Sequence, residues 1–272
     1  MARPAIEERF PRPSVMGVLN VTPDSFSDGG AHLTVDAAVT TAWAMLDAGA
    51  AIVDVGGEST RPGSAAVPLD EELRRVVPVL EHLAGSPVSI DTSKAEVARR
   101  AVGLGAELVN DVTALRADPE LAGVVADSGC YLCLMHMLGE PRTMQEDPRY
   151  DDVVSEVKRF LEERLAVAVA AGIDESRICL DPGFGFGKTP AHNFELLRRL
   201  DEPCALGRPI LVGASRKSSL ARATGADGPV GSTAASVGAA VAAFDRGAAI
   251  IRAHDVREHV EALAAAQAVA GS

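Results

Sequence analysis

Polar side chains recur at one kind of place in this 272-residue chain, at or just after the end of a short apolar run. Each run is bounded by polar or glycine residues, which is typical of a buried strand. The polar groups are carboxylates, amides, hydroxyls and cations, which can bind a polar ligand or stabilise charge. They are Asn20, Asp54, Asp91, Asn110 with Asp111, His136, Asp181, Ser215-Arg-Lys217, Arg252 and His254.

These groups fall into two chemical kinds. Asp91, Asn110 and Asp181 are acceptors or amides, and they suit a flat heterocycle that carries N–H donors. The second kind is basic and occurs in the last part of the chain, where arginine suits bidentate contacts to phosphate oxygens. Because the net charge is −12, a local cationic cluster indicates an anionic substrate. Its members are Ser215, Arg216, Lys217, Arg252 and His254.

Each polar residue taken alone has a simpler interpretation. Asp54 or Asn110 is also typical of a turn, and Asp91 of a helix cap. His136 is compatible with a structural histidine that has its hydrogen bonds satisfied. The joint placement of all these residues after successive runs favours one functional site.

The runs alternate with longer amphipathic segments, and this alternation predicts an α/β protein with a parallel sheet and helical crossovers. Eight such units in about 250 residues predict a TIM (β/α)8 barrel. We expect one barrel domain over residues 15–270, preceded by an N-terminal extension over residues 1–14. The alternative, a doubly wound open sheet, usually has a glycine-rich first turn, which Asn20-Val-Thr-Pro-Asp24 lacks. The predicted strands are 15–20, 51–55, 87–91, 107–110, 130–135, 178–181, 209–212 and 249–252.

The predicted helices occupy 35–48, 69–83, 94–102, 118–128, 153–172, 191–200, 232–244 and 256–269. Residues 91–93, Asp-Thr-Ser, are expected to supply the N-cap of the third of these helices. In a barrel of this class the active site gathers at the C-terminal ends of the strands. The polar residues should therefore meet at one rim.

Composition narrows the functional class. Hydrophobic residues make up 47% of the chain and charged residues 24%, values that are ordinary for a globular protein. The acidic net charge disfavours nucleic acid as a partner. Residues 1–13 lack the apolar segment of a signal peptide, and no window approaches about 20 apolar residues, so we expect a cytoplasmic protein without a membrane partner. Cys130 and Cys133 should lie on opposite faces of one strand rather than form a redox pair.

Two loops, residues 20–30 and 56–63, are polar, punctuated by glycine and proline, and long enough to act as lids. Two other segments resemble known motifs without matching them. The segment 182–189 is similar to a Walker A loop, but Pro182 stands where the first glycine is required. The segment 213–217 is similar to a nucleophile elbow, but Lys217 replaces its last glycine.

From about Met16 to Leu263 the chain resembles the bacterial dihydropteroate synthase family. The first two of the segments that carry this resemblance are long and distinctive. The segments are Met16-Gly-Val-Leu-Asn-Val-Thr-Pro-Asp-Ser-Phe-Ser-Asp-Gly-Gly30, Val53-Asp-Val-Gly-Gly-Glu-Ser-Thr-Arg-Pro-Gly63, Ser89-Ile-Asp-Thr92, Asn110-Asp111, Leu180-Asp-Pro-Gly-Phe-Gly-Phe-Gly-Lys188 and Gly213-Ala-Ser-Arg-Lys217.

The resemblance implies an enzyme of folate biosynthesis that joins 6-hydroxymethyl-7,8-dihydropterin pyrophosphate to p-aminobenzoate by dissociative substitution at the pterin methylene. It implies Mg²⁺ coordinated near Asn20, a homodimer, and sulfonamides as competitors of p-aminobenzoate. It also implies a set of pterin ligands: Asp91, Asn110, Met135, Asp181, Phe186, Gly213 and Lys217. The implied pyrophosphate ligands are Asn20, Arg252 and His254. The implied p-aminobenzoate ligands are Phe26, Thr60, Arg61, Pro62 and Ser218.

By the same resemblance, the catalytic residues are Asp91, Asp181, Arg61, Lys217, Arg252 and His254. The last strand departs from the family pattern only in Ala253, where valine is usual. Two related hypotheses stay open: a pterin-dependent methyltransferase, which has no need of the lid residues 60–62 or of the Arg252 and His254 pair, and a catalytically silent pterin-binding paralogue. A general phosphate-binding barrel would leave the 20–30 loop unexplained.

Overall fold

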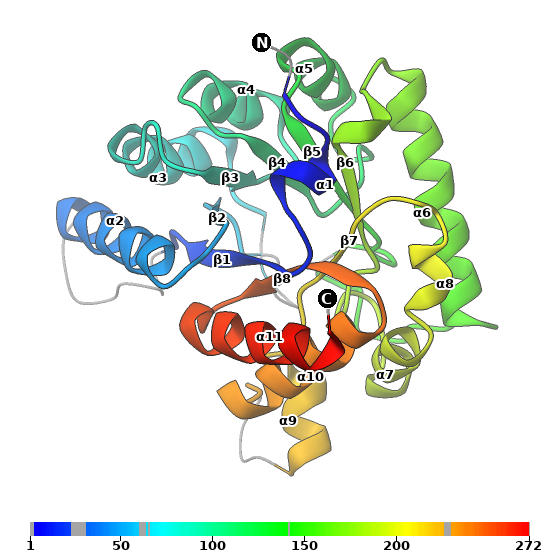
Figure 1. Cartoon of the computed structure of the whole chain (residues 1–272). Coiled ribbons are helices and arrows are strands. Elements are labelled where there is room, and N and C mark those ends of the chain that lie inside the picture. The colour runs from blue at the N-terminus through cyan, green and yellow to red at the C-terminus, as the bar shows by residue number, and fades with distance from the viewer. Residues whose placement is uncertain are drawn as a thin grey trace.

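The computed structural model describes residues 3–22, 31–59, 64, 66–140, 142–225 and 230–271. Its strands form a closed barrel in which each one pairs in parallel with the next and the last pairs with the first. Figure 1 shows the helices around this barrel. The predicted (β/α)8 architecture is confirmed. The strands are β1 (Ser14–Asn20), β2 (Ile52–Gly56), β3 (Val88–Asp91), β4 (Leu108–Asp111), β5 (Tyr131–Met135), β6 (Ile178–Asp181), β7 (Ile210–Val212) and β8 (Ala248–Ala253).

Every predicted helical segment contains a helix, and each strand lies within about two residues of its predicted bounds. The longer helices are α2 (Ala31–Asp47), α3 (Leu69–His82), α4 (Ala95–Gly103), α5 (Leu121–Ser128), α6 (Val153–Ala170), α7 (Pro190–Arg198), α10 (Thr233–Asp245) and α11 (Val256–Ala270). The short elements that the sequence did not predict are α1 (Ile6–Arg9), η2 (Glu175–Arg177), α8 (Asp201–Cys204) and α9 (Ser218–Thr224).

The predicted cap of α4 is wrong. No side chain of residues 91–93 caps this helix, whose N-cap residue is Lys94. The amide of Ala95 instead donates to Asp118 Oδ2 at 2.8 Å. A carboxylate from the loop that precedes α5 therefore satisfies this amide, which leaves Asp91 available to the barrel mouth.

The barrel interior is built in layers, because alternate residues of a strand face the same side. One apolar layer includes Met16, Leu108, Cys133, Cys179 and Ile250, which form one buried cluster. Ile6 and Phe10 belong to the same cluster. Helix α1 therefore closes the N-terminal end of the barrel, where Figure 1 shows it in front of the strands. The N-terminal extension thus contributes to the core.

A larger apolar cluster fills the space between the strands and the helices. Cys130 belongs to this outer cluster, whereas Cys133 belongs to the interior one, which confirms that the two thiols lie on opposite faces. Within the described residues, the helices are all too short or too polar to cross a membrane.

Candidate active site

The polar residues meet at the C-terminal end of the barrel because of strand period and register. Two residues beyond the apolar layer, the same inward-facing positions are occupied by Asn110, Asp181 and Arg252. Strand pairing sets Asp91 opposite Asn110 and Met135 opposite Asp181. The fold therefore brings together acceptors from β3, β4 and β6 and a cation from β8, as the sequence predicted.

Asp54 lies at the centre of the hydrogen bonds in this mouth, and its side chain is fully buried. Its Oδ1 accepts from Ser89 Oγ at 2.6 Å. Its Oδ2 accepts from Asn110 Nδ2 at 2.9 Å and from Arg252 Nε at 2.7 Å. The sequence predicts Asp54 only as a polar residue at the end of a strand, with no ligand role. A carboxylate inside the apolar run of β2 was the signal available.

Arg252 links two carboxylates from different strands. Besides Asp54, its Nη2 donates to Asp91 Oδ2 at 2.8 Å. Burial raises the pKa of Asp91 to about 7, and Arg252 opposes this shift. Burial alone would lower the pKa of Arg252, but Asp54 and Asp91 hold it above its ordinary value. The guanidinium therefore stays charged.

Asp181 occupies the opposite side of the mouth. Its Oδ1 accepts from the amide of Gly183 at 2.6 Å. Burial raises the pKa of Asp181 to about 6, and the Gly183 amide, Lys217, Lys188 and Arg252 oppose this shift. A ligand that presents N–H donors to this carboxyl would favour its ionised form.

An apolar wall stands beside these polar groups. Phe186 packs against a buried cluster of Val112, Met135, Met137 and Met144. The ammonium group of Lys217 lies 4.1 Å from the centre of the Phe186 ring, within the range of a cation–π contact. The predicted residues Met135, Phe186 and Lys217 thus border the same mouth as Asp181. The other members of the wall cannot be predicted from the sequence, because nothing in their spacing distinguishes them from core residues.

The loop between β6 and α7 carries Phe186 and is held closely. Gly183 has a φ of +70°, and a Cβ there would lie 1.8 Å from the His136 carbonyl oxygen, so only glycine fits. Lys188 at the end of this loop is buried. Its Nζ donates to His136 Nδ1 at 2.8 Å and to the carbonyls of Gly183 and Phe186 at 3.0 Å each. The sequence alone indicates no role for Lys188, since its partners become apparent only in the fold.

The part of the mouth that follows β7 and β8 contains Ser215 and His254. Ser215 Oγ accepts from the His254 amide at 3.2 Å and lies 3.1 Å from His254 Nδ1. The hydroxyl and Nδ1 share one hydrogen bond, whose direction depends on the tautomer of the imidazole. Burial and Arg252 lower the pKa of His254 to about 3, so this imidazole is neutral at pH 7.

The remaining described site residues lie around this rim. Asn20 ends β1 and is half-buried. A Cβ on Gly213, just after β7, would lie 3.7 Å from Arg252 Cβ, which is ordinary contact. Ser218 is the exposed first residue of α9. Four predicted ligands, Phe26, Thr60, Arg61 and Pro62, lie outside the described residues.

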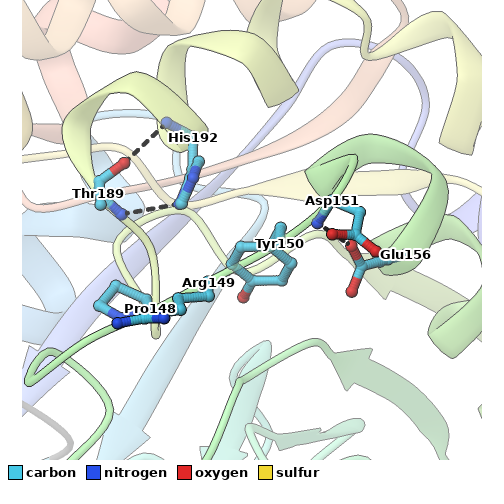
Figure 2. A pocket seen from close by; sticks show the side chains of 7 residues that line it. All are labelled: Pro148, Arg149, Tyr150, Asp151, Glu156, Thr189 and His192. Atoms are coloured by element: carbon cyan, nitrogen blue, oxygen red, sulfur yellow. Dashed lines mark hydrogen bonds between the residues drawn. The ribbon is translucent and has the colours of Figure 1, made fainter.

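A separate hollow of about 560 Å³ lies beside α6 and α7. Figure 2 shows the lining residues, which include Tyr150, Glu156, Thr189 and His192. Thr189 and His192 bond to each other in a capping box, so these polar groups already serve the start of α7. None of the predicted ligands lines this hollow, and we assign it no ligand.

Comparison with known proteins agrees with this geometry. A family model described as pterin binding enzyme matches residues 16–254. Dihydropteroate synthase of Escherichia coli K12 is 50% identical over 259 residues, which cover 94% of this chain and 91% of that protein.

Two solved structures of the Xanthomonas albilineans dihydropteroate synthase are also similar to this chain. The one with 4-aminobenzoic acid has a TM-score of 0.90 and 51% identity, and the match covers 97% of this chain and 95% of that one. The one in complex with 7,8-dihydropteroate has a TM-score of 0.86 and 48% identity, with the same coverage. The chain therefore belongs to the pterin-binding enzyme family and, within it, to the dihydropteroate synthases.

Proposed function

We propose that the barrel mouth condenses 6-hydroxymethyl-7,8-dihydropterin pyrophosphate with p-aminobenzoate to give 7,8-dihydropteroate and pyrophosphate. The observation that carries this proposal is the meeting of Asp91, Asn110 and Asp181 with Arg252 at one end of the barrel. Acceptors for a ring with N–H donors stand beside cations for a leaving phosphate group. The enzyme is thus a transferase of folate biosynthesis.

The pterin ring lies between the acceptors and the apolar wall in this proposal. Asp181 and Asn110 bind its polar edge, while Met135, Phe186 and Gly213 border its faces. Asp91 and Asp181 favour the positive charge that develops on the pterin when pyrophosphate leaves. Dissociative substitution needs no strong base or nucleophile, and the mouth residues of the described chain include no serine–histidine–carboxylate triad.

The leaving pyrophosphate is bound by Asn20, Arg252 and His254. Arg252 supplies a fixed positive charge, and neutral His254 donates from Nε2. The described residues contain no cluster of three or more histidine, cysteine or carboxylate side chains around a metal site. A single protein ligand, the side-chain oxygen of Asn20, is compatible with Mg²⁺. This ion usually keeps several waters and is bound by one or two protein oxygens together with substrate phosphates. When bound there, Mg²⁺ supplies further positive charge for the leaving group.

In this proposal, p-aminobenzoate binds next to Phe186 and Lys217. Ser218, at the start of α9, binds the carboxylate through its hydroxyl and its amide. The loops that carry Phe26, Thr60, Arg61 and Pro62 close over the amine, position it and exclude water, which would trap the cation. Sulfonamides compete at this subsite. We further propose a homodimer located in the cytoplasm.

The test is release of pyrophosphate by the purified protein with dihydropterin pyrophosphate and Mg²⁺, with and without p-aminobenzoate. Dihydropteroate and pyrophosphate should form together only with both substrates, and EDTA should abolish turnover. Pterin binding without turnover would instead identify a catalytically silent paralogue. The molar mass in solution tests the dimer.

A further inference from the structure

We propose that Lys188 is a positioning residue for the pterin site: its buried ammonium group fixes the loop between β6 and α7 in the shape that places Phe186 beside Lys217, and it supplies positive charge to Asp181. This inference rests on the proposed ring-binding roles of Asp181 and Phe186. It assigns no contact between Lys188 and substrate.

The hydrogen bonds of Lys188 are the first support. An ammonium group has three donors, and Nζ has three partners: His136 Nδ1 and the carbonyls of Gly183 and Phe186. Two of these partners belong to the loop itself and the third to the segment after β5. Lys188 therefore ties two carbonyls of the loop to the residue that follows β5.

Side chains outside the loop make hydrogen bonds to the rest of its backbone. The Gly185 carbonyl accepts from Gln145 Nε2 at 2.6 Å, and its amide donates to Asn193 Oδ1 at 2.7 Å. The Gly187 carbonyl accepts from the Tyr150 hydroxyl at 2.7 Å. Among the described side chains, Lys188 alone donates to the carbonyls of Gly183 and Phe186, and the Gly183 carbonyl also accepts from the Phe186 amide at 3.1 Å.

The link to Asp181 is both geometric and electrostatic. Gly183, whose carbonyl binds Lys188, donates its amide to Asp181 Oδ1 at 2.6 Å. Lys188 also opposes the effect of burial on the pKa of Asp181. Burial lowers the pKa of Lys188 itself to about 7, although Asp181 opposes that shift. Between about pH 6 and pH 7 the carboxylate and the ammonium are therefore charged together.

Other ionisable groups face this pair from the surrounding elements. His136 has a pKa lowered to about 2 by burial, Lys188 and Arg116, so it accepts as a neutral imidazole. The charged groups that also act on Lys188 or Asp181 are Lys217 and Arg252. His192 of α7 has its pKa lowered by burial and by Lys188, and burial raises that of Tyr150, so both side chains are neutral at pH 7.

A pH profile of ring affinity follows. Affinity for a pterin without pyrophosphate should fall on the acid side as Asp91 and Asp181 gain protons and on the alkaline side as Lys188 loses one. Lys188→Met removes the ammonium and keeps the length of the side chain. We expect about tenfold weaker pterin binding at pH 6.5, an acid limb displaced to higher pH, and no alkaline limb from Lys188.

The experiment is calorimetric titration of each protein with 6-hydroxymethylpterin from pH 5 to pH 8.5, alongside its thermal unfolding. Lys158→Met on α6 is the matched control and should leave both limbs unchanged. His136→Phe keeps a ring but removes one acceptor, so it should move only the alkaline limb, to lower pH. If Lys188→Met does not fold, this variant decides the question.

A folded Lys188→Met protein with unchanged affinity and limbs would overturn the proposal, as would an alkaline limb that His136→Phe leaves in place. Absence of pterin binding by the unsubstituted protein would overturn the ring-site assignment itself. The two failures are therefore distinguishable.

Discussion

Arg252 on β8 and Asp91 on β3 form an ion pair across the barrel mouth, with Nη2 and Oδ2 separated by 2.8 Å. The cation assigned to the leaving pyrophosphate thus binds a carboxyl assigned to the pterin ring. The same guanidinium bonds Asp54 at 2.7 Å. One side chain therefore couples the two halves of the site.

This coupling predicts that Arg252→Met weakens binding of a pterin that carries no phosphate. Without the guanidinium, burial and Asp54 would raise the pKa of Asp91 further. The carboxyl would then be neutral, and a neutral carboxyl accepts hydrogen bonds from ring N–H donors more weakly than a carboxylate does. We expect about a tenfold loss of 6-hydroxymethylpterin affinity at pH 7 and a larger loss of kcat/KM. Calorimetry and steady-state kinetics measure the two effects. Exposed Arg257 on α11 provides the control, Arg257→Met. Unchanged affinity for the bare pterin would show that Arg252 acts on phosphate alone.

Asp54 is predicted to be necessary for the stability of the barrel mouth. Asp54→Ala leaves the hydroxyl of Ser89, the amide of Asn110 and the guanidinium of Arg252 without this buried partner. Removing one member of a buried ion pair typically costs about 3–5 kcal/mol, so we expect the free energy of unfolding to fall by roughly that amount. Urea unfolding measures it, with exposed Asp47→Ala as the control. Asp54→Asn should lose less, and a loss below about 1 kcal/mol for Asp54→Ala would contradict the central position of Asp54.

The sequence predicted the barrel because its signal is local. Each strand is a short apolar run, and the polar residue that ends it is placed at the rim by the topology. Short elements such as α9 carry too few residues for a periodic pattern, and α1 is stabilised by tertiary packing of Ile6 and Phe10. The cap of α4 was missed because Asp118 lies 23 residues from Ala95, whose amide donates a hydrogen bond to it.

The placement of several residues at the barrel mouth was predicted for the same reason. Asp91, Asn110, Asp181 and Arg252 are inward-facing residues near the ends of their strands, so strand period was enough to place them. Lys188 was missed because its partner His136 lies 52 residues away. A buried lysine has no sequence signature of its own.

Asp181 is predicted to reduce stability at neutral pH in return for ring binding. Its pKa is raised from 3.8 to about 6 by burial. A carboxyl with a raised folded pKa contributes stability that is complete below its unfolded pKa and is lost as pH rises through the folded value. Asp181→Asn retains an oxygen for the Gly183 amide, so its advantage over the unsubstituted protein should grow between pH 4 and pH 7, to about 3 kcal/mol at most.

Urea unfolding at pH 5 and pH 8 tests this prediction, with exposed Asp127→Asn as the control. The same Asp181→Asn protein should bind 6-hydroxymethylpterin poorly at both values. A stability difference independent of pH would refute the raised pKa of Asp181.

Ser215 is predicted to set the proton position of His254. The hydroxyl accepts from the His254 amide and lies 3.1 Å from Nδ1, and we expect it to donate its proton to Nδ1, which keeps the proton of the neutral imidazole on Nε2. In Ser215→Ala the two tautomers compete, and fewer molecules present Nε2–H to the leaving group. We expect kcat to fall about tenfold while KM for p-aminobenzoate is unchanged, since hydrogen bonding in acid catalysis acts on the transition state.

Ser215→Thr, which retains the hydroxyl, should recover most of the rate. Nitrogen NMR of labelled histidine reports the tautomer directly. A slow Ser215→Ala enzyme in which His254 still carries its proton on Nε2 would assign the loss of rate to packing instead.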